Sequence, residues 1–182
     1  MNTFLIILFI ILIIIISILI TYIILYNKIN ETIIRINEAE NRIDNNLRDK
    51  YDTLNRASTL IKSKIKIKDD DFKELIKLKS RKLSNFELDR ILVKIHNEFI
   101  SIYEKNKELR ESDEIYKASK QLELIDEELV TLRNYYNGNI ATYNKMIKKF
   151  PTLIIAKIKK YNERPFYDLK DQTDDDYEDF KL

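Results

Sequence analysis

The sequence predicts an all-α protein in which a single N-terminal transmembrane helix continues into an elongated antiparallel four-helix bundle. Three observations support this fold class. Residues 4–26 form an uncharged and almost wholly apolar run. Beyond it, apolar residues recur at spacings of three and four, which places them on one face of a helix. The 182 residues include one glycine and two prolines, so few residues that disfavour helices interrupt these stripes.

The apolar run from Phe4 to Tyr26 is predicted to cross a lipid bilayer. Its 23 residues span about 34 Å as a helix, against a hydrocarbon core of about 30 Å. A cleaved signal peptide is the alternative, but the first four residues, MNTF, carry no basic side chain and no A-x-A-like site follows. We therefore expect residues 1–27 to be an uncleaved anchor.

The orientation follows from the basic residues that flank the predicted span. None precedes it, whereas Lys28, Arg35 and Arg42 follow it closely. The positive-inside rule then places the N-terminus outside the cell membrane and the C-terminal body in the cytoplasm.

The anchor is expected to run without a break into the first bundle helix, giving a rod of about 60 residues and on the order of 90 Å. Glu40 and Lys50 interrupt its apolar stripe, and we expect their long side chains to reach water with their charged ends. The stripe consists of Ile29, Ile33, Ile36, Ile43, Leu47, Leu54, Ala57 and Ile61.

Two shorter helices are predicted next. The alternating segment 62–68 is interpreted as a frayed helix end and a turn, and Asp69–Asp71 as the N-cap and first turn of a helix over residues 71–82. The face of that helix would carry Phe72, Leu75, Ile76 and Lys79. A further helix begins near Ser84, whose spacing to Glu87 fits a capping box. We expect it to bury Leu88, Ile91, Leu92, Ile95, Phe99 and Ile102.

The last predicted helix runs from its cap at Ser112 to Phe150, where Pro151 ends it. Gly138 is interpreted as a tolerated mid-helix glycine, because the apolar register continues across it. The stripe consists of Ile115, Ala118, Leu122, Ile125, Leu129, Leu132, Tyr136, Ile140, Tyr143, Ile147 and Phe150. Single stripes on helices of matched length are expected to be buried against one another.

Composition argues against most catalytic and cofactor chemistry, so we predict no catalytic residue, no cofactor and no metal ligand. Without cysteine there is no thiolate, and one glycine cannot build a phosphate-binding loop. The single histidine, His96, is expected at the surface or boundary of the bundle. The acidic residues of the last helix are expected on its solvated face; they are Glu123, Asp126, Glu127 and Glu128.

The net charge of +2 is an average over three unlike segments. The anchor is uncharged, residues 28–162 carry 29 bases and 22 acids, and residues 163–182 carry three bases and eight acids. We predict that 28–162 form the bundle and that 163–182 form an acidic, disordered tail. The basic run 56–82 could contact an acidic partner or nothing; no specific nucleic acid is expected.

Three runs of the sequence carry recognisable motifs. The first is EAENRIDNNLRDKYDTL from Glu38, and the second is Leu109–Ser112 together with Leu122. The third extends from Leu129 and contains Arg133, Tyr136-Asn137, Tyr143-Asn144, Phe150-Pro151, Ile155-Ala156 and Phe166-Tyr167-Asp168. Together they resemble the LemA family. The sequence departs from the family at Glu40, where an aromatic is usual, at Asn55, where a proline is usual, and at Lys157 and Lys160, where glycines are usual.

The resemblance implies a membrane-anchored antiparallel four-helix bundle of the bacterial envelope, and it implies no catalytic residues. We therefore expect a non-enzymatic membrane-tethered scaffold that contacts unidentified envelope proteins, with the acidic tail as one candidate contact. The alternative is an envelope enzyme that uses carboxylate, lysine and tyrosine side chains. It would require polar groups to converge inside the bundle. Homo-oligomerisation is left open.

Overall fold

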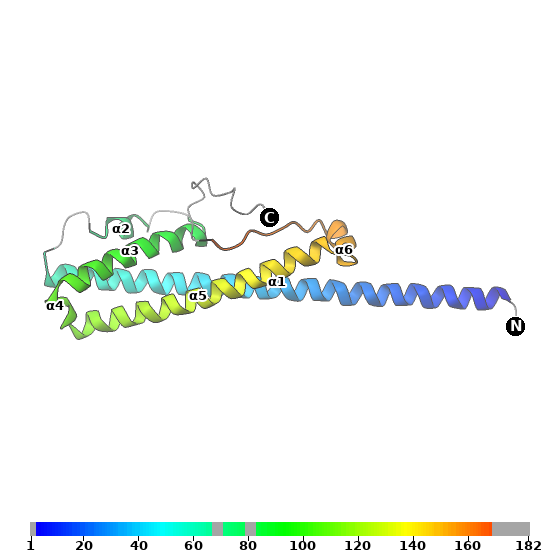
Figure 1. The fold of residues 1–182 in the computed structure, drawn as a ribbon, viewed down its shortest axis with the longest axis horizontal. Helices are drawn as coiled ribbons and strands as arrows, with labels where there is room; N and C mark the ends of the chain where they lie inside the picture. Colours follow the sequence, from blue (N-terminus) through cyan, green and yellow to red (C-terminus); the bar gives the residue numbers. More distant parts are fainter. Residues whose placement is uncertain (1–2, 67–70, 79–82, 169–182) are drawn as a thin grey trace. The chain divides into compact units, whose positions relative to one another are not determined.

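The protein is described here by a computed structural model covering residues 3–66, 71–78 and 83–168. Its helices are α1 (Thr3–Lys64), α2 (Lys73–Leu78), α3 (Asn85–Lys105), α4 (Lys107–Arg110), α5 (Asp113–Lys148) and α6 (Thr152–Lys159) (Figure 1). The described residues contain no strand, which confirms the all-α prediction.

The described residues form two compact units, and α1 and α5 each contribute to both. The first unit contains residues 3–39 and 135–166, and the second contains residues 40–134 with Tyr167 and Asp168.

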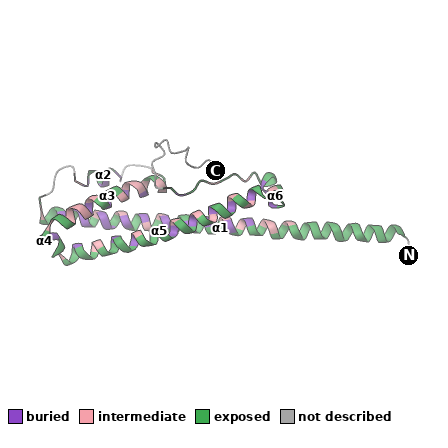
Figure 2. Ribbon diagram, in the orientation of Figure 1, coloured by how far each residue is buried: buried purple, intermediate pink, exposed green. Residues whose placement is uncertain are grey.

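Helix α1 confirms that the apolar run continues without a break into the helix predicted to follow it. It is 62 residues long, and within the described residues it is the one helix long and apolar enough to span a membrane. Residues 3–21 are all exposed, and burial begins at Tyr22 (Figure 2). From Ile29 onward the predicted stripe is buried, except for the half-buried Ile33.

The two charged residues that interrupt this stripe have different environments. Glu40 is exposed, because Ala39 occupies the inward position beside it. Lys50 is completely buried, so the prediction that its ammonium group reaches water is wrong. Its ion pair is described below.

Helix α2 is confirmed over part of its predicted range, while Lys79 and Asp69 lie outside the described residues. Phe72 and Leu75 are buried, but Ile76 is 62% exposed, which corrects its expected place on the inner face. Phe72 has a left-handed backbone conformation with φ of 60°, and its N–H donates to the Glu98 side chain on α3 at 3.0 Å. This bond ties the start of α2 to α3.

Helix α3 begins with the predicted capping box. The Glu87 N–H donates to Ser84 Oγ at 3.3 Å, and the Ser84 N–H donates to Glu87 Oε2 at 2.9 Å. Of the six residues expected to be buried on α3, Leu92, Ile95 and Phe99 are buried, whereas Leu88, Ile91 and Ile102 are half-buried.

Helix α5 confirms the long last helix and its continuation across Gly138, but it ends at Lys148. Its stripe is buried except at Ala118, which is half-buried, and at Phe150, which is 76% exposed and so does not belong to the core. Beyond Pro151 the chain forms α6, which the sequence does not predict as a separate helix. The described part of the predicted tail, residues 163–168, also makes defined contacts.

Candidate functional site

The polar groups of the second unit converge on the carboxylate of Asp126, on α5. Lys50 of α1 donates from Nζ to Asp126 Oδ1 at 2.5 Å, and His96 Nδ1 of α3 lies 2.6 Å from Oδ2. Three helices therefore meet at one carboxylate, with both of its oxygens engaged. The Lys50 side chain is fully buried, that of His96 is 10% exposed, and that of Asp126 is 34% exposed.

Two opposing effects set the protonation of Asp126. Burial alone raises the pKa of its carboxyl group, because the charged form loses hydration. The hydrogen bonds and positive charges of His96 and Lys50 outweigh that effect, so the pKa of Asp126 lies below its ordinary value. The carboxylate is therefore ionised at neutral pH and balances the buried ammonium of Lys50.

These positions correct two sequence predictions. His96 is buried and lies within hydrogen-bond distance of Asp126, rather than at the surface or boundary of the bundle, and Asp126 turns inward while Glu123, Glu127 and Glu128 are exposed. The signal was present at Lys50, which lies three residues after Leu47 and four before Leu54, at a core position of the stripe. A lysine there needs a buried acid, and Asp126 lies between Leu122 and Leu129 of the opposing stripe.

A second buried ion pair joins α3 to α5. Arg133 donates from Nε and Nη2 to the two oxygens of Asp89, at 2.9 and 2.8 Å. Asp89 is fully buried and the Arg133 side chain is 13% exposed. Such a bidentate pair fixes orientation as well as charge. Arg133 belongs to a motif identified in the sequence, but its partner Asp89 was not predicted.

Tyr167 completes this second pair. Its hydroxyl lies 3.0 Å from Asp89 Oδ2 and 3.1 Å from the Asn85 carbonyl oxygen, and its ring packs edge-on against Phe86 with centroids 4.4 Å apart. Burial and the neighbouring Asp89 charge raise the pKa of the Tyr167 phenol. Tyr167 is buried, so the predicted disorder of the tail does not hold at this residue; residues 169–182 lie outside the described residues.

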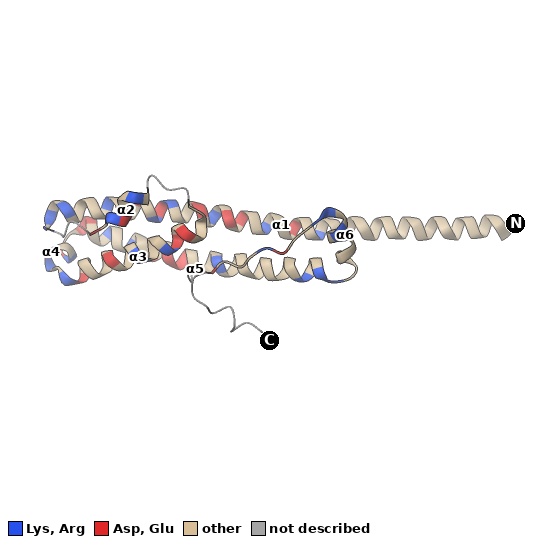
Figure 3. Ribbon diagram, turned by 90° about the horizontal axis from the view of Figure 1, so that it is seen from above, with Lys and Arg blue, Asp and Glu red and all other residues tan. Residues whose placement is uncertain are grey.

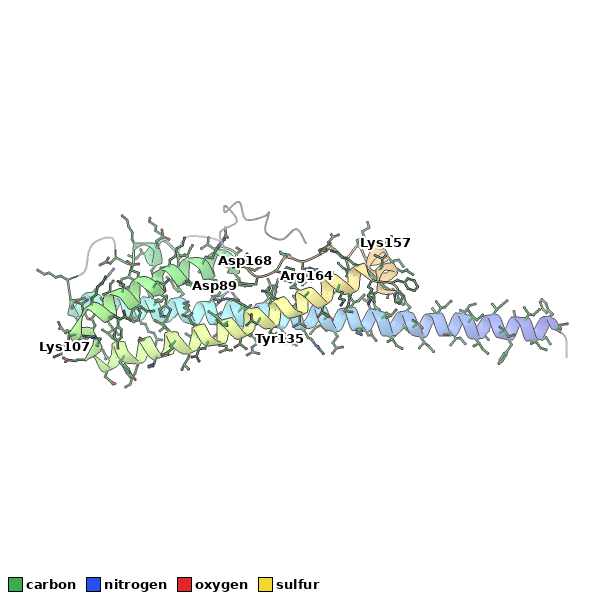
Figure 4. All side chains as sticks on the ribbon, in the orientation of Figure 1. Asp89, Lys107, Tyr135, Lys157, Arg164 and Asp168 are labelled. Carbon is green, nitrogen blue, oxygen red and sulfur yellow. The ribbon has the colours of Figure 1, made fainter. Side chains whose placement is uncertain are left out.

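The motif residues of the first unit hold the chain that follows α6. Asn144 and Arg164 exchange two hydrogen bonds, from the Arg164 N–H to Asn144 Oδ1 at 3.0 Å and from Asn144 Nδ2 to the Arg164 carbonyl at 2.9 Å. Arg164 is labelled in Figure 4 on the chain that follows α6. Its guanidinium lies 5.5 Å from the centre of the Tyr143 ring and donates to Asn37. The Tyr143-Asn144 motif therefore holds the backbone at Arg164 in place.

An open cleft of about 440 Å³ lies in the second unit, apart from both ion pairs. The Tyr51 hydroxyl there is buried, and no hydrogen-bond partner is found for it among the described residues. Burial, followed by the nearby Asp52, raises the pKa of Tyr51. The cleft is lined by Asp44, Arg48, Tyr51, Asp52, Leu78, Leu83, Asn85 and Leu88.

The contacts of this arrangement are ion pairs and hydrogen bonds among side chains of α1, α3 and α5. Neither Lys50, His96 nor Asp126 lines the cleft, and the hydrogen bonds found for the Asp126 oxygens are to Lys50 and His96. In the part of the chain that the structure describes, no group of three or more histidine, cysteine or acidic side chains is placed to hold a metal ion.

A family model described as the LemA family matches residues 39–178, which is more than half of the chain. Comparison with curated proteins and with solved structures finds no significant match. The matched range contains both buried ion pairs and the Tyr-Asn, Phe-Pro and Ile-Ala motifs.

Proposed function

Because the chain belongs to the LemA family, we propose that it is a non-enzymatic, membrane-tethered helical-bundle protein of the bacterial envelope that acts as a scaffold. In this proposal residues 4–26 cross the cell membrane, the N-terminus lies outside and the body lies in the cytoplasm. The observation that carries the proposal is the single unbroken helix α1, which joins an exposed apolar segment to helices with charged outer faces.

The exposure of α1 supports the membrane span. Between Phe4 and Ile20 every large apolar side chain is at least 41% exposed. A continuous apolar surface of this size is unfavourable in water, and a helix satisfies its own backbone in lipid.

The contacts between α1 and α5 support an antiparallel bundle in the second unit. Moving along α1, Arg42 bonds Glu128, Lys50 bonds Asp126 and Arg56 bonds Gln121. The partner numbers fall on α5 as they rise on α1, as expected for helices that run in opposite directions. With α2 and α3, these segments fit a four-helix arrangement.

Exposed apolar side chains on the second unit favour the scaffold role. Leu124 and Val130 of α5 are 65% and 51% exposed, and Ile76 of α2 is 62% exposed. Because single exposed apolar residues are common on protein surfaces, these side chains alone do not define a partner. We therefore propose the acidic residues of 163–182 as a second contact, whose negative charge steers basic partners toward the chain.

Cross-linking in native membranes tests this role. The chain has no cysteine, so Leu124→Cys provides one attachment point and Lys117→Cys, also exposed on α5, provides its matched control. We expect Leu124→Cys to give discrete adducts, identified by mass spectrometry, that the control lacks. Identical adduct patterns would contradict the scaffold proposal, and an adduct of twice the chain mass would identify the partner as a second copy.

A protease test addresses the orientation. A C-terminal tag should resist protease in intact cells and be digested after lysis. Digestion in intact cells would reverse the proposed orientation and leave the scaffold role to be tested outside the cytoplasm.

One observation favours the alternative of an envelope enzyme, namely the convergence of Lys50, Asp126 and His96. If these groups were catalytic, the His96→Gln chain would fail to replace the parent chain in cells from which its gene is deleted, while its unfolding temperature would be unchanged. We expect the opposite: a lower unfolding temperature, with the variant still able to replace the parent chain at a permissive temperature.

A further inference from the structure

Helix α6 carries two unlike faces beside the end of the apolar run. Thr152, Ile155 and Ala156 are buried within the first unit. At four-residue spacing on another face, Phe150 just before the helix, Ile154 and Ile158 are 76%, 52% and 63% exposed. An apolar stripe at this spacing requires a covering surface or faces lipid.

The position of α6 indicates which surface covers that stripe. The Lys159 ammonium lies 5.3 Å from the centre of the Tyr26 ring, at the last residue of the apolar run of α1. Tyr22 and Tyr26 stack with centroids 6.1 Å apart, where the interfacial belt of a membrane helix is expected. Helix α6 therefore lies at the level where the proposed span leaves the hydrocarbon core.

The charge of this segment complements anionic lipid. Residues 145–162 contain six lysines and no acidic residue. Lysines at 157, 159 and 160 are in or next to α6, and Figure 3 shows basic residues on α6 beside an uncharged stretch of α1. An apolar stripe flanked by lysines is the composition of helices that lie in a membrane interface.

We propose that α6 is a second membrane contact, in which Phe150, Ile154 and Ile158 enter the interface while the flanking lysines bind anionic headgroups. The inference rests on the proposed span of residues 4–26. It makes α6 an interfacial element that fixes the first unit against the bilayer surface, in addition to the transmembrane anchor.

Depth-dependent quenching of single labels tests the inference. The full chain, purified and reconstituted in vesicles, is labelled with an environment-sensitive fluorophore at Ile154→Cys, at Leu124→Cys or at Ile14→Cys. Vesicles of phosphatidylcholine, with or without phosphatidylglycerol, contain lipids that bear a quencher. We expect strong quenching at Ile14, several-fold more quenching at Ile154 than at Leu124, and an increase at Ile154 when phosphatidylglycerol is present.

The three labels separate failure of the inference from failure of the proposed function. Quenching at Ile14 with a water-exposed signal at Ile154 would overturn the interfacial contact and keep the span. Loss of quenching at Ile14 would overturn the span, and the α6 inference with it. A label at Ile154 that is shielded from water but insensitive to quenching lipid, and more shielded at higher protein density, would assign the stripe to a second copy.

A charge variant tests the headgroup contact separately. Lys157→Glu should lower the quenching at Ile154 in phosphatidylglycerol vesicles to the level in neutral vesicles, while its circular dichroism matches that of the parent chain. Unchanged quenching would show that the lysines bind no anionic headgroup, and would reduce the contact to the apolar stripe alone.

Discussion

Asp89 and Asp126 are two paired carboxylates of the same unit with different environments. Asp89 is fully buried, meets a bidentate guanidinium and lies beside the Tyr167 hydroxyl. Asp126 is one-third exposed and divides its oxygens between a lysine and a histidine. Water has no access to the Asp89 carboxylate, whereas it can reach the Asp126 carboxylate, so removing the basic partner should have unequal consequences in the two pairs.

Breaking the Asp89 pair should have the largest effect. Asp89→Ala leaves the Arg133 guanidinium nearly buried without its carboxylate, and we expect a loss of about 3–5 kcal/mol in the free energy of unfolding. Urea titration of the purified full chain in detergent, followed by circular dichroism, measures it. Arg133→Lys is the matched control, because it keeps the charge but loses the bidentate geometry. A smaller loss of unfolding free energy for Asp89→Ala than for Asp126→Ala would contradict this ranking of the two pairs.

Breaking the Asp126 cluster should depend on which partner is removed. Asp126→Ala strands the fully buried Lys50 ammonium and should cost about 3 kcal/mol. Lys50→Met removes the buried charge and leaves a carboxylate that water reaches, so we expect a cost of about 1–2 kcal/mol. The same urea titration measures both variants. Equal losses would show that exposure of Asp126 does not matter.

Acid should weaken the Asp126 cluster. Since the folded-state pKa of Asp126 lies below its unfolded value of about 3.9, its contribution is complete above that value and is lost as the pH falls through the folded-state pKa. The difference in unfolding free energy between the parent chain and Asp126→Asn should therefore shrink as the pH is lowered below the unfolded-state value. A difference that stays constant over this range would place the stabilisation elsewhere.

Removing either of two tyrosine hydroxyls should have the smallest effect on the free energy of unfolding. Tyr167→Phe removes a hydroxyl bonded at Asp89 and should cost about 1–2 kcal/mol. Tyr51→Phe removes a buried hydroxyl for which the described part of the chain provides no partner, so the free energy of unfolding of this variant should stay the same or rise by about 1 kcal/mol. Thermal unfolding of the two variants side by side gives the comparison; a larger loss for Tyr51→Phe would indicate a partner for its hydroxyl.

The fold was largely predictable because helical periodicity reports directly on burial. The stripes of α1 and α5, the continuity of α1, the capping box at Ser84 and the helical Gly138 all follow from local spacing. The separate helix α6 was missed because Phe150-Pro151 was interpreted only as an end. The residues beyond it form a helix although half of them are β-branched, because proline is tolerated at a helix start and Ile155 and Ala156 are buried.

The ion pairs were harder to predict because a pattern shows which position is inward, but not which partner faces it. Lys50 occupied a core position, yet a flexible lysine was assumed to reach water. Asp126 and His96 lie next to core residues rather than on the stripes, so their inward rotation depends on how α1, α3 and α5 pack. Tyr167 was assigned to a tail by the acidic composition around it, although one aromatic can be buried within such a segment.

Lys160 gives the α6 inference a consequence for protein engineering. It caps α6 with φ of 54°, a left-handed conformation that costs a non-glycine residue about 1–2 kcal/mol, at a position where LemA proteins usually carry glycine. Restoring glycine there should raise the unfolding temperature and at the same time weaken adhesion to acidic vesicles. At this residue, stability and membrane adhesion make opposite demands, so a screen that selects only for thermal tolerance would select against adhesion.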